Sequence, residues 1–481
     1  MQYDRLSTGI SGLDKVLEGG LIPRRTYLVR GGPGAGKTTL GLQFLAAGAA
    51  DNETTLFICL GEAEAQVRSN ADRQGFNIQG INFLDLSPGS SFFTEVETYD
   101  IFSPAEVERE PTTQLIVEQV RQVQPQRVFI DAMTQFRYLS SDVFQFRKQV
   151  LSFLRFLLEQ GATVLFASES SEMNPDDDLQ FMSDGVIDLR YGGGDRSLTV
   201  IKFRGSHFQS GAHTLRLLDN GVAVFPRLQP EHYKRDFALE PISSGVTELD
   251  TMLHGGIERG TVTVLTGPTG VGKTSLSVHF AKAAAQRGER AVLYTFEEHV
   301  NILVQRAEAT GTPVKEMIQQ GSLSIVPIES LLLSPDEFAD LVRQQVEEQQ
   351  VRLVIIDSIA GYKLSVRGTD LIMHLHALCR YLRNVGMTVI LINETEDITG
   401  DFRVTGIAIS YLADNIVFLR YLEIGGELRK AIGVLKKRLS NFERTLRELE
   451  ITSEGIKVGQ PLTGLRGVLS GIPEWIDERD T

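Results

Sequence analysis

The chain repeats itself, and this internal repeat constrains its fold more than any other feature. Residues 7–21 read STGISGLDKVLEGGL, and residues 243–257 read SSGVTELDTMLHGGI. The glycine-rich stretch that follows also recurs, and its two lysines, Lys37 and Lys273, are 236 residues apart, as are the matching positions before them. A chain of 481 residues built from two such copies is expected to form two similar domains, each with its own core.

Each copy alternates apolar strand candidates with helix candidates. TYLVRG leads through a glycine-rich turn into TTLGLQFLAAGAA, and TVTVLTG leads in the same way into TSLSVHFAKAAAQRG. This alternation predicts α/β domains with a mainly parallel sheet flanked by helices. The copies are joined by FPRLQPEHYKRDFALEP, which contains prolines and mixed charges. We therefore place the first domain at residues 1–230, a linker at 231–240 and the second domain at 241–481.

The composition, with 42% hydrophobic and 23% charged residues, is that of a soluble globular protein. The formal net charge of −14 disfavours broad nucleic-acid binding, which depends on clustered lysine and arginine. The two cysteines, Cys59 and Cys379, lie in apolar runs of different copies, so a disulfide framework or a zinc site is not expected. Because no apolar run could span a bilayer and the N-terminus has no leader pattern, we expect a cytoplasmic protein without a membrane partner.

Both copies contain the complete phosphate-loop pattern G-x-x-x-x-G-K-[ST]. Its glycines let successive backbone N–H groups point at phosphate, and the following helix adds its positive N-terminal end. We therefore expect ATP as the ligand, with the lysines at the outer phosphates and Thr38 and Thr274 binding Mg²⁺. The predicted nucleotide-binding residues are Gly31, Gly32, Gly34, Ala35, Gly36, Lys37, Thr38 and Thr39, and in the second copy Gly267, Thr269, Gly270, Val271, Gly272, Lys273, Thr274 and Ser275.

An aspartate ends a later apolar strand candidate in each copy, Asp131 in RVFID and Asp357 in RLVIID. An aspartate in this place can hold the Mg²⁺ of a bound nucleotide, which is the role we expect. The alternative is a helix cap. These two residues are 226 apart rather than 236, so the middle of the first copy is longer.

Hydrolysis needs a group that orients or deprotonates the attacking water. The strand candidate AVLYTF is followed by Glu297 and Glu298, whereas the matching TLFICL is followed by Gly61 and Glu62. We expect Glu297 to be the base, with Glu298 and Glu62 as further catalytic candidates, and solvated strand-end glutamates are the alternative. Because the first copy has glycine opposite Glu297, the second copy is expected to hydrolyse ATP faster.

Near the end of each copy a strand candidate carries two cations in the pattern K-x-R. These are Lys202 and Arg204 in the first copy, and Lys436 and Arg438 in the second. Alternate residues of a strand point to one face, so each pair suits a finger that reaches the ATP of a neighbouring subunit. A solvated basic edge strand is the alternative.

Together these features resemble the KaiC family of circadian-clock ATPases and autokinases. The resemblance covers nearly the whole chain and is carried by the STGI opening, both phosphate loops, the EE strand end, the K-x-R strands and the run DNIVFLRYLEIGGELRKAIGVLKKR. It implies two tandem RecA-like P-loop domains and a homohexamer of two stacked rings with ATP between subunits. It also implies slow hydrolysis in the first ring and autophosphorylation in the second. Glu297 matches the family's catalytic glutamate, and Lys436 and Arg438 match residues that touch the neighbour's phosphates.

The family's phosphoacceptors are an adjacent serine and threonine, and the segment here reads VTGIAISYLADNI. Ser410 falls on the serine, Tyr411 on the threonine, and Thr405 on a nearby threonine that the family also uses. Because tyrosine replaces threonine, the alternatives are phosphorylation of Ser410 alone and a purely structural role for that serine.

The resemblance also bears on partners. The chain ends with LSGIPEWIDERDT, so the KaiA-binding tail of the cyanobacterial proteins is largely missing and KaiA dependence is not expected. A KaiB-like partner of the first ring remains open. Two other functions also remain open: a RecA-type nucleic-acid motor or recombination accessory, which the net charge disfavours, and a nucleotide-gated hexameric scaffold, which Gly61 favours for the first ring.

Overall fold

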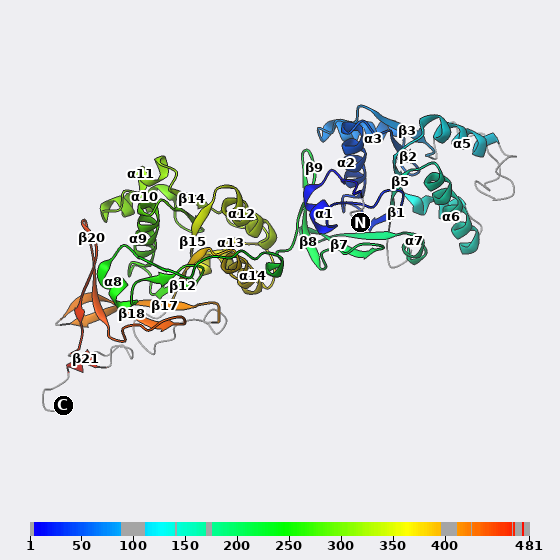
Figure 1. Ribbon diagram of the computed structural model, residues 1–481. Helices are drawn as coiled ribbons and strands as arrows, with labels where there is room; N and C mark the ends of the chain where they lie inside the picture. The colour runs from blue at the N-terminus through cyan, green and yellow to red at the C-terminus, as the bar shows by residue number, and fades with distance from the viewer. Residues whose placement is uncertain are drawn as a thin grey trace. The chain divides into compact units, whose positions relative to one another are not determined.

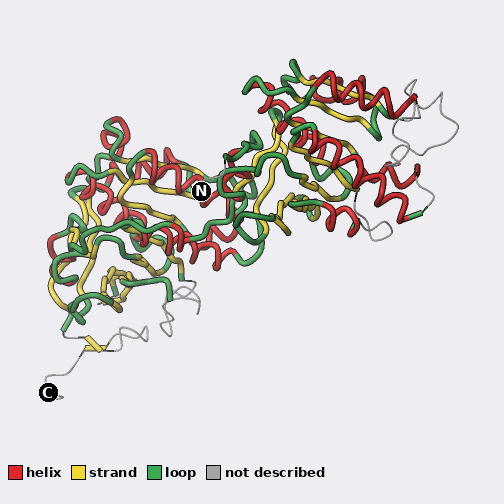
Figure 2. The backbone as a smooth tube through the Cα atoms, turned by 45° about the vertical axis from the view of Figure 1, so that its right-hand side comes forward, coloured by secondary structure: helices red, strands yellow, loops and turns green. Residues whose placement is uncertain are grey.

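The computed structural model describes residues 4–87, 111–139, 142–169, 176–395, 411–424, 426–463, 465–466 and 474–475. The chain divides into two compact units, Met1–Arg227 and Leu228–Thr481. Each unit is a sheet with helices on both faces (Figure 1). Figure 2 shows the same layering, with the strands of each unit lying between its helices. Among the described helices, none has the length and apolar character needed to cross a membrane.

The two sheets have the same strand order within the described residues. The order is β3-β2-β4-β5-β1-β6-β7-β8-β9 in the first unit and β14-β13-β15-β16-β12-β17-β18-β19-β20 in the second. The first six strands of each order pair in parallel. The sixth strand, β6 or β17, and the three that follow it are joined by antiparallel pairings. The predicted α/β fold with a mainly parallel sheet is thus confirmed, whereas the antiparallel extension was not foreseen.

In the first unit the strands are β1 (Thr26–Gly31), β2 (Thr55–Cys59), β3 (Ile81–Asp85), β4 (Arg127–Asp131), β5 (Thr163–Glu169), β6 (Gly185–Gly192), β7 (Asp195–Phe203), β8 (Ala212–Leu218) and β9 (Gly221–Phe225). In the second unit they are β12 (Val262–Gly267), β13 (Arg290–Thr295), β14 (Leu323–Pro327), β15 (Val351–Asp357), β16 (Thr388–Glu394), β17 (Asn415–Ile424), β18 (Glu427–Lys437), β19 (Arg447–Thr452) and β20 (Gly455–Pro461). Two short pairs lie outside these sheets, β10 (Pro241–Ile242) with β11 (Ile257–Glu258), and β21 (Leu465–Arg466) with β22 (Glu474–Trp475).

One face of the first sheet is covered by α1 (Ser11–Val16), α2 (Lys37–Ala50) and α3 (Glu64–Arg73), and the other by α5 (Pro111–Val123), the 3₁₀ helix η1 (Met133–Leu139), α6 (Val143–Glu159) and α7 (Asp177–Met182). The second sheet has α8 (Thr247–Met252), α9 (Lys273–Gln286), α10 (Val300–Ala309) and α11 (Val314–Gln319) on one face, and α12 (Pro335–Glu348), α13 (Ile359–Ser365) and α14 (Leu371–Asn384) on the other. Because strand side chains alternate in direction, neighbouring residues of β1 enter different cores. Tyr27 and Val29 pack with α2, and Leu28 packs with α6.

The opening motif of each copy has a structural role. Asp14 accepts hydrogen bonds from the backbone N–H and the hydroxyl of Thr8, at 2.8 and 2.7 Å. Asp250 accepts the same two bonds from Ser244, at 2.8 and 2.7 Å. The aspartate thus fixes the turn that enters α1 or α8, which explains why this part of the repeat recurs so closely.

The segment between the two copies packs on the second unit. The short 3₁₀ helix η2 (Pro230–His232) lies against α14, where the Asn384 side-chain amide donates to the Pro230 carbonyl at 2.7 Å. Tyr233 meets Tyr381 edge to face, with ring centroids 5.0 Å apart. Phe237 lies against Gly260 and Gly386, where an added Cβ would come within 2.3 and 2.7 Å of its ring. Much of the predicted linker therefore contributes to the packing of the second unit.

Candidate active site

The phosphate loops connect β1 to α2 and β12 to α9. In the second unit the Lys273 ammonium donates to the carbonyls of Gly267 and Pro268, both at 2.9 Å. The corresponding Lys37 donates to Gly31 and Gly32 at 2.9 and 3.0 Å. Each lysine is thus folded back into its own loop, in a position from which it can turn to an anion.

The residue before each lysine has a left-handed backbone conformation that favours glycine. Gly272 has φ of 115°, a conformation that side chains disfavour. A Cβ here would also lie 2.2 Å from Ile451, and one at the matching Gly36 would lie 2.9 Å from Leu217. The backbone conformation therefore favours glycine at both positions, and a Cβ there would also require the end of the Ile451 or Leu217 side chain to move.

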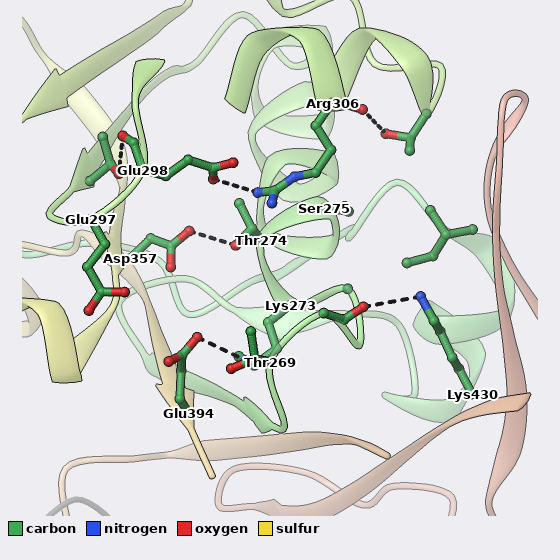
Figure 3. Close-up of a pocket in the computed structure, with 15 residues that line it drawn as sticks. Thr269, Lys273, Thr274, Ser275, Glu297, Glu298, Arg306, Asp357, Glu394 and Lys430 are labelled. Carbon is green, nitrogen blue, oxygen red and sulfur yellow. Dashed lines mark hydrogen bonds and ion pairs between the residues drawn. The ribbon is translucent and has the colours of Figure 1, made fainter. Parts of the chain in front are cut away.

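A pocket of about 310 Å³ opens above the loop of the second unit (Figure 3). Its lining includes these predicted site residues: Thr269, Gly270, Gly272, Lys273, Thr274, Ser275, Glu297, Glu298 and Asp357. It also includes residues that the sequence reasoning missed: Thr295, Arg306, Thr310, Glu394, Lys430 and Ile451. Gly267 and Val271 do not line it, and both Val271 and the matching Ala35 are buried in the hydrophobic cores.

The predicted magnesium residues meet in both units. The Thr274 hydroxyl donates to Asp357 at 2.7 Å, and the Thr38 hydroxyl donates to Asp131 at 2.6 Å. Burial raises the pKa of Asp357 to about 6, against the opposing effect of the Thr274 hydrogen bond. Burial raises the pKa of Asp131 in the same way. A cation beside either carboxylate would favour its ionised form.

The loop lysines are also buried, and burial lowers the pKa of both Lys37 and Lys273. Glu394, at the end of β16, partly offsets this for Lys273, because its carboxylate lies 3.8 Å from the ammonium. Glu169 ends the matching strand β5 and acts on Lys37 in the same direction. The strand-end rule that identified Asp357 could also have identified Glu394, since TVILINE ends beside the loop.

The two glutamates after β13 differ in their surroundings. Glu298 forms an ion pair with Arg306 of α10, with 2.7 Å between the charged groups. Glu297 makes no hydrogen bond or ion pair with any described residue. In Figure 3 Glu297 and Asp357 lie on the same side of the pocket, across from Lys430. Of the two, Glu297 has the carboxylate available to a water molecule.

The first unit lacks the counterparts of both Glu297 and Arg306. Gly61 stands in place of Glu297, and Asn70 stands 236 residues before Arg306, so that Glu62 has no arginine opposite it. Glu62 itself is exposed. The predicted difference between the two strand ends therefore extends to the helix that faces them.

Each unit holds a further cation on its loop that the sequence reasoning missed. Lys430 donates to the Gly270 carbonyl at 3.3 Å, and Arg196 donates to the Gly34 carbonyl at 3.1 Å. Both come from the antiparallel part of the sheet. Because that extension was not foreseen, no signal placed these residues at the loop.

The K-x-R cations lie at the opposite end of the sheet from the loop of their own unit. Lys436 pairs in register with Ile416, at the start of β17, and the start of β17 pairs with the start of β12. The loop follows the other end of β12, about 17 Å away for a six-residue strand. Lys202 pairs in the same way with Val186, near the start of β6. Neither pair can reach the nucleotide of its own unit.

The K-x-R side chains contact the segment that enters β6 or β17. Lys202 donates to the carbonyls of Gln180 and Ser183, at 2.9 and 2.6 Å, and Arg204 lies 3.8 Å from Asp184. In the second unit Lys436 donates to the Ala413 carbonyl at 2.7 Å, and Arg438 lies 3.1 Å from Asp414. The two copies thus place their cations alike, with about half of each arginine side chain exposed.

Of the predicted phosphoacceptors, the structure describes only Tyr411, whose surface is 74% exposed. Ser410 and Thr405 lie outside the described residues. Tyr411 precedes Ala413 and therefore lies at the same end of the sheet as Lys436. Its neighbourhood is the K-x-R end and not the loop of its own unit.

The residues present fit ATP and Mg²⁺. Each loop offers a lysine, a helix N-terminus and left-handed glycines to phosphate, and each offers one threonine hydroxyl and one aspartate to a hard cation. Oxygen ligands of this kind are what Mg²⁺ prefers. The donor sets of both units therefore suit a magnesium–nucleotide complex.

Comparison with known proteins agrees with this geometry. The family described as "ATPase: KaiC" matches the chain twice, over residues 6–229 and 242–463. A circadian clock oscillator protein KaiC of Prochlorococcus marinus is 29% identical over 100% of this chain and 97% of its own length. The circadian clock protein KaiC3 of Synechocystis is 27% identical over 98% of this chain and 94% of its own. The chain therefore belongs to the KaiC family of ATPases.

Proposed function

We propose that the chain binds MgATP in both domains and hydrolyses it, with the faster turnover in the second. The observation that carries this proposal is the pocket above β12. A loop lysine, the Thr274–Asp357 pair and the unpaired carboxylate of Glu297 all line it.

The roles of these residues follow from their chemistry. Lys273 leaves the loop carbonyls and binds the outer phosphates. Burial disfavours the charged form of its ammonium, and the negative charge of the phosphates favours it. Thr274 and Asp357 hold Mg²⁺, which neutralises charge on the phosphates when it is bound. Glu297 accepts a proton from the attacking water, while Glu298 stays engaged with Arg306.

The K-x-R end of the sheet supports assembly into a ring. Lys436 and Arg438 cannot reach the nucleotide of their own unit, and Arg438 is about half exposed. Two cations in that position suit the phosphates of a neighbouring subunit, as an arginine finger supplied in trans does. We propose a homohexamer, as the family resemblance implies.

The same end supports autophosphorylation between subunits. Tyr411 lies beside the segment that Lys436 contacts, and Ser410 precedes Tyr411 in the chain. If the cations meet a neighbour's ATP, Tyr411 lies at the end of the sheet that faces this ATP. We propose Ser410 as the acceptor, with transfer of a phosphoryl group from ATP to its hydroxyl.

One experiment on the full chain tests the proposal. The protein is incubated with MgATP, and phosphate release, intact mass and oligomer size are measured together, with Lys37→Ala/Lys273→Ala as the matched variant. Phosphate release that the double variant loses supports the ATPase, and an added phosphoryl mass that maps to Ser410 supports the autokinase.

The same experiment can contradict the proposal. If phosphate release rises when DNA is added to the same reaction, the protein is a nucleic-acid motor. Assembly without phosphate release indicates a scaffold. Unchanged binding and turnover in the double variant would refute the assignment of the phosphate loops.

A further inference from the structure

The two domains place a side chain and a glycine in exchanged positions beside the same aspartate. In the second domain Glu297 follows β13, and Gly361 lies four residues after Asp357. A Cβ built on Gly361 would lie 3.1 Å from Oε1 of Glu297. The glutamate therefore fills the space that a side chain at position 361 would need.

The first domain has the reverse arrangement. Gly61 follows β2 at the position of the glutamate, and Gln135 lies four residues after Asp131, at the position of the glycine. A Cβ built on Gly61 would lie 3.5 Å from Nε2 of Gln135. The amide of Gln135 thus occupies the space next to the strand end, which the glutamate occupies in the second domain.

Backbone hydrogen bonds attach this space to the predicted magnesium site. The N–H groups of Leu60 and Gly61 donate to the carbonyl of Asp131 at 2.8 and 3.3 Å, and Phe296 donates to the carbonyl of Asp357 at 3.2 Å. Asp131 is the carboxylate that accepts from Thr38 of the phosphate loop. Gln135 therefore lies next to the nucleotide-binding machinery and not at a remote surface.

The Gln135 side chain is available for a ligand of its own. It is half-buried, and its amide makes no hydrogen bond with any described residue. A half-buried amide without a protein partner can both donate to and accept from a water molecule.

We infer that Gln135 is the residue that positions the attacking water in the first domain. This inference rests on the proposed hydrolysis of ATP. The water oxygen forms a bond to the γ-phosphorus while the bond to the bridging oxygen breaks, giving ADP and inorganic phosphate. Because an amide cannot take up a proton, the water proton passes to a phosphate oxygen. A glutamine orients the attacking water in the same way in small GTPases.

The competing candidate in the first domain is Glu62. It is exposed, and asparagine stands where the second domain places the arginine that holds Glu298. Glu62 corresponds in the repeat to Glu298 and not to Glu297, and an exposed carboxylate is held in place less firmly than a half-buried amide next to the strand end. The two candidates predict different rankings of variants.

The test uses the full chain with Glu297→Ala, which leaves neither a carboxylate nor an amide in this space of the second domain, so that the remaining phosphate release reports mainly on the first domain. In this background Gln135→Ala is expected to lower kcat about tenfold or more and to leave KM for ATP within about twofold. Glu62→Gln is expected to cost less than Gln135→Ala. The unchanged KM distinguishes loss of water positioning from damage to the phosphate loop.

An exchange variant supplies the second readout. A side chain at position 61 would make only ordinary contacts, all with Gln135, so Gly61→Glu combined with Gln135→Gly recreates the arrangement of the second domain. This pair is expected to raise kcat by about 10- to 100-fold over the Glu297→Ala background. It should also add an acidic limb to the pH profile, because a carboxylate base is lost on protonation.

The possible outcomes separate the inference from the proposed function. An unmodified chain that releases no phosphate refutes the proposed hydrolysis itself. If the unmodified chain turns over ATP but Glu297→Ala abolishes it, or if Glu62→Gln costs more than Gln135→Ala, then Gln135 has no such role.

Discussion

Replacing Glu297 by glutamine tests the chemistry of the second domain most directly. The carboxylate has no partner among the described residues, so the substitution removes a base without breaking an internal contact. We expect a change of less than about 0.5 kcal/mol in the free energy of unfolding. Loss of a general base typically lowers the rate about 10²- to 10⁴-fold, which corresponds to about 3–5 kcal/mol in the activation barrier.

The measured effect depends on both domains, because total phosphate release is the sum of two rates. With Glu297→Gln the second domain keeps only an amide beside the strand end, so the total falls towards the slow rate of the first domain. We expect KM for ATP to change little, since the phosphate loop and the Thr274–Asp357 pair stay intact. Steady-state phosphate release over a range of ATP concentrations measures both constants.

Glu298→Gln is the matched control. It removes the same charge one residue along the chain but breaks the ion pair with Arg306, whose side chain is 46% exposed. Such a pair contributes about 0–1 kcal/mol to stability, and we expect a smaller loss of rate than with Glu297→Gln. If Glu297→Gln keeps the parent rate while Glu298→Gln or Glu62→Gln abolishes it, the assignment of the base is wrong.

Three further predictions concern stability and assembly. Arg127 is fully buried and donates to two backbone carbonyls and to Glu53, so Arg127→Leu should lower the free energy of unfolding by about 3–5 kcal/mol, measured with denaturant. The second domain has leucine and alanine at the positions of Arg127 and Gly48, so adding Gly48→Ala should recover part of that loss. Strictly additive effects of the two substitutions would contradict this. Burial lowers the pKa of His279 to about 4. The contribution of the neutral imidazole to stability is therefore complete above about pH 6.5 and is lost as the pH falls towards 4, by at most about 3 kcal/mol. His279→Gln should flatten this part of the pH–stability curve, and an unchanged slope would assign the pH dependence to other groups. Lys273→Ala and Arg438→Ala should each lower turnover in the second domain. If the K-x-R cations act on a neighbour, mixing and reassembling the two variants should restore turnover, because one chain keeps Lys273 and the other keeps Arg438. No recovery in assemblies shown to contain both chains would place the cations outside catalysis.

The sequence predicted those parts of the site that lie in short continuous patterns. The phosphate loops, Asp131 and Asp357 were found in this way, because a strand end next to a glycine-rich loop has few alternatives. Arg306 and Lys430 were missed because two separate elements, α10 and β18, bring them to the pocket. Their positions depend on strand order and on an antiparallel extension that periodicity alone does not specify.

The exchange of Glu297 and Gly361 for Gly61 and Gln135 was also hidden in the sequence. Gly61 and Glu297 are 236 residues apart, whereas Gln135 and Gly361 are 226 apart, so a single offset cannot align both pairs. Gly61 alone suggested a loss of function in the first domain. Only the packing of η1 against the strand end revealed that another side chain fills the space.

The packing of the connecting segment on α14 determines where the chain can be cut. A fragment that began at residue 241 would leave Tyr381 without its aromatic neighbour and would uncover the hollow formed by Gly260 and Gly386. A fragment that begins at Leu228 would keep both contacts. Proteolysis between residues 237 and 240 would therefore do more than separate two halves, since Tyr233 and Phe237 would no longer be joined to the second unit and an aromatic-sized gap could open next to the helix that leads into β16 and Glu394.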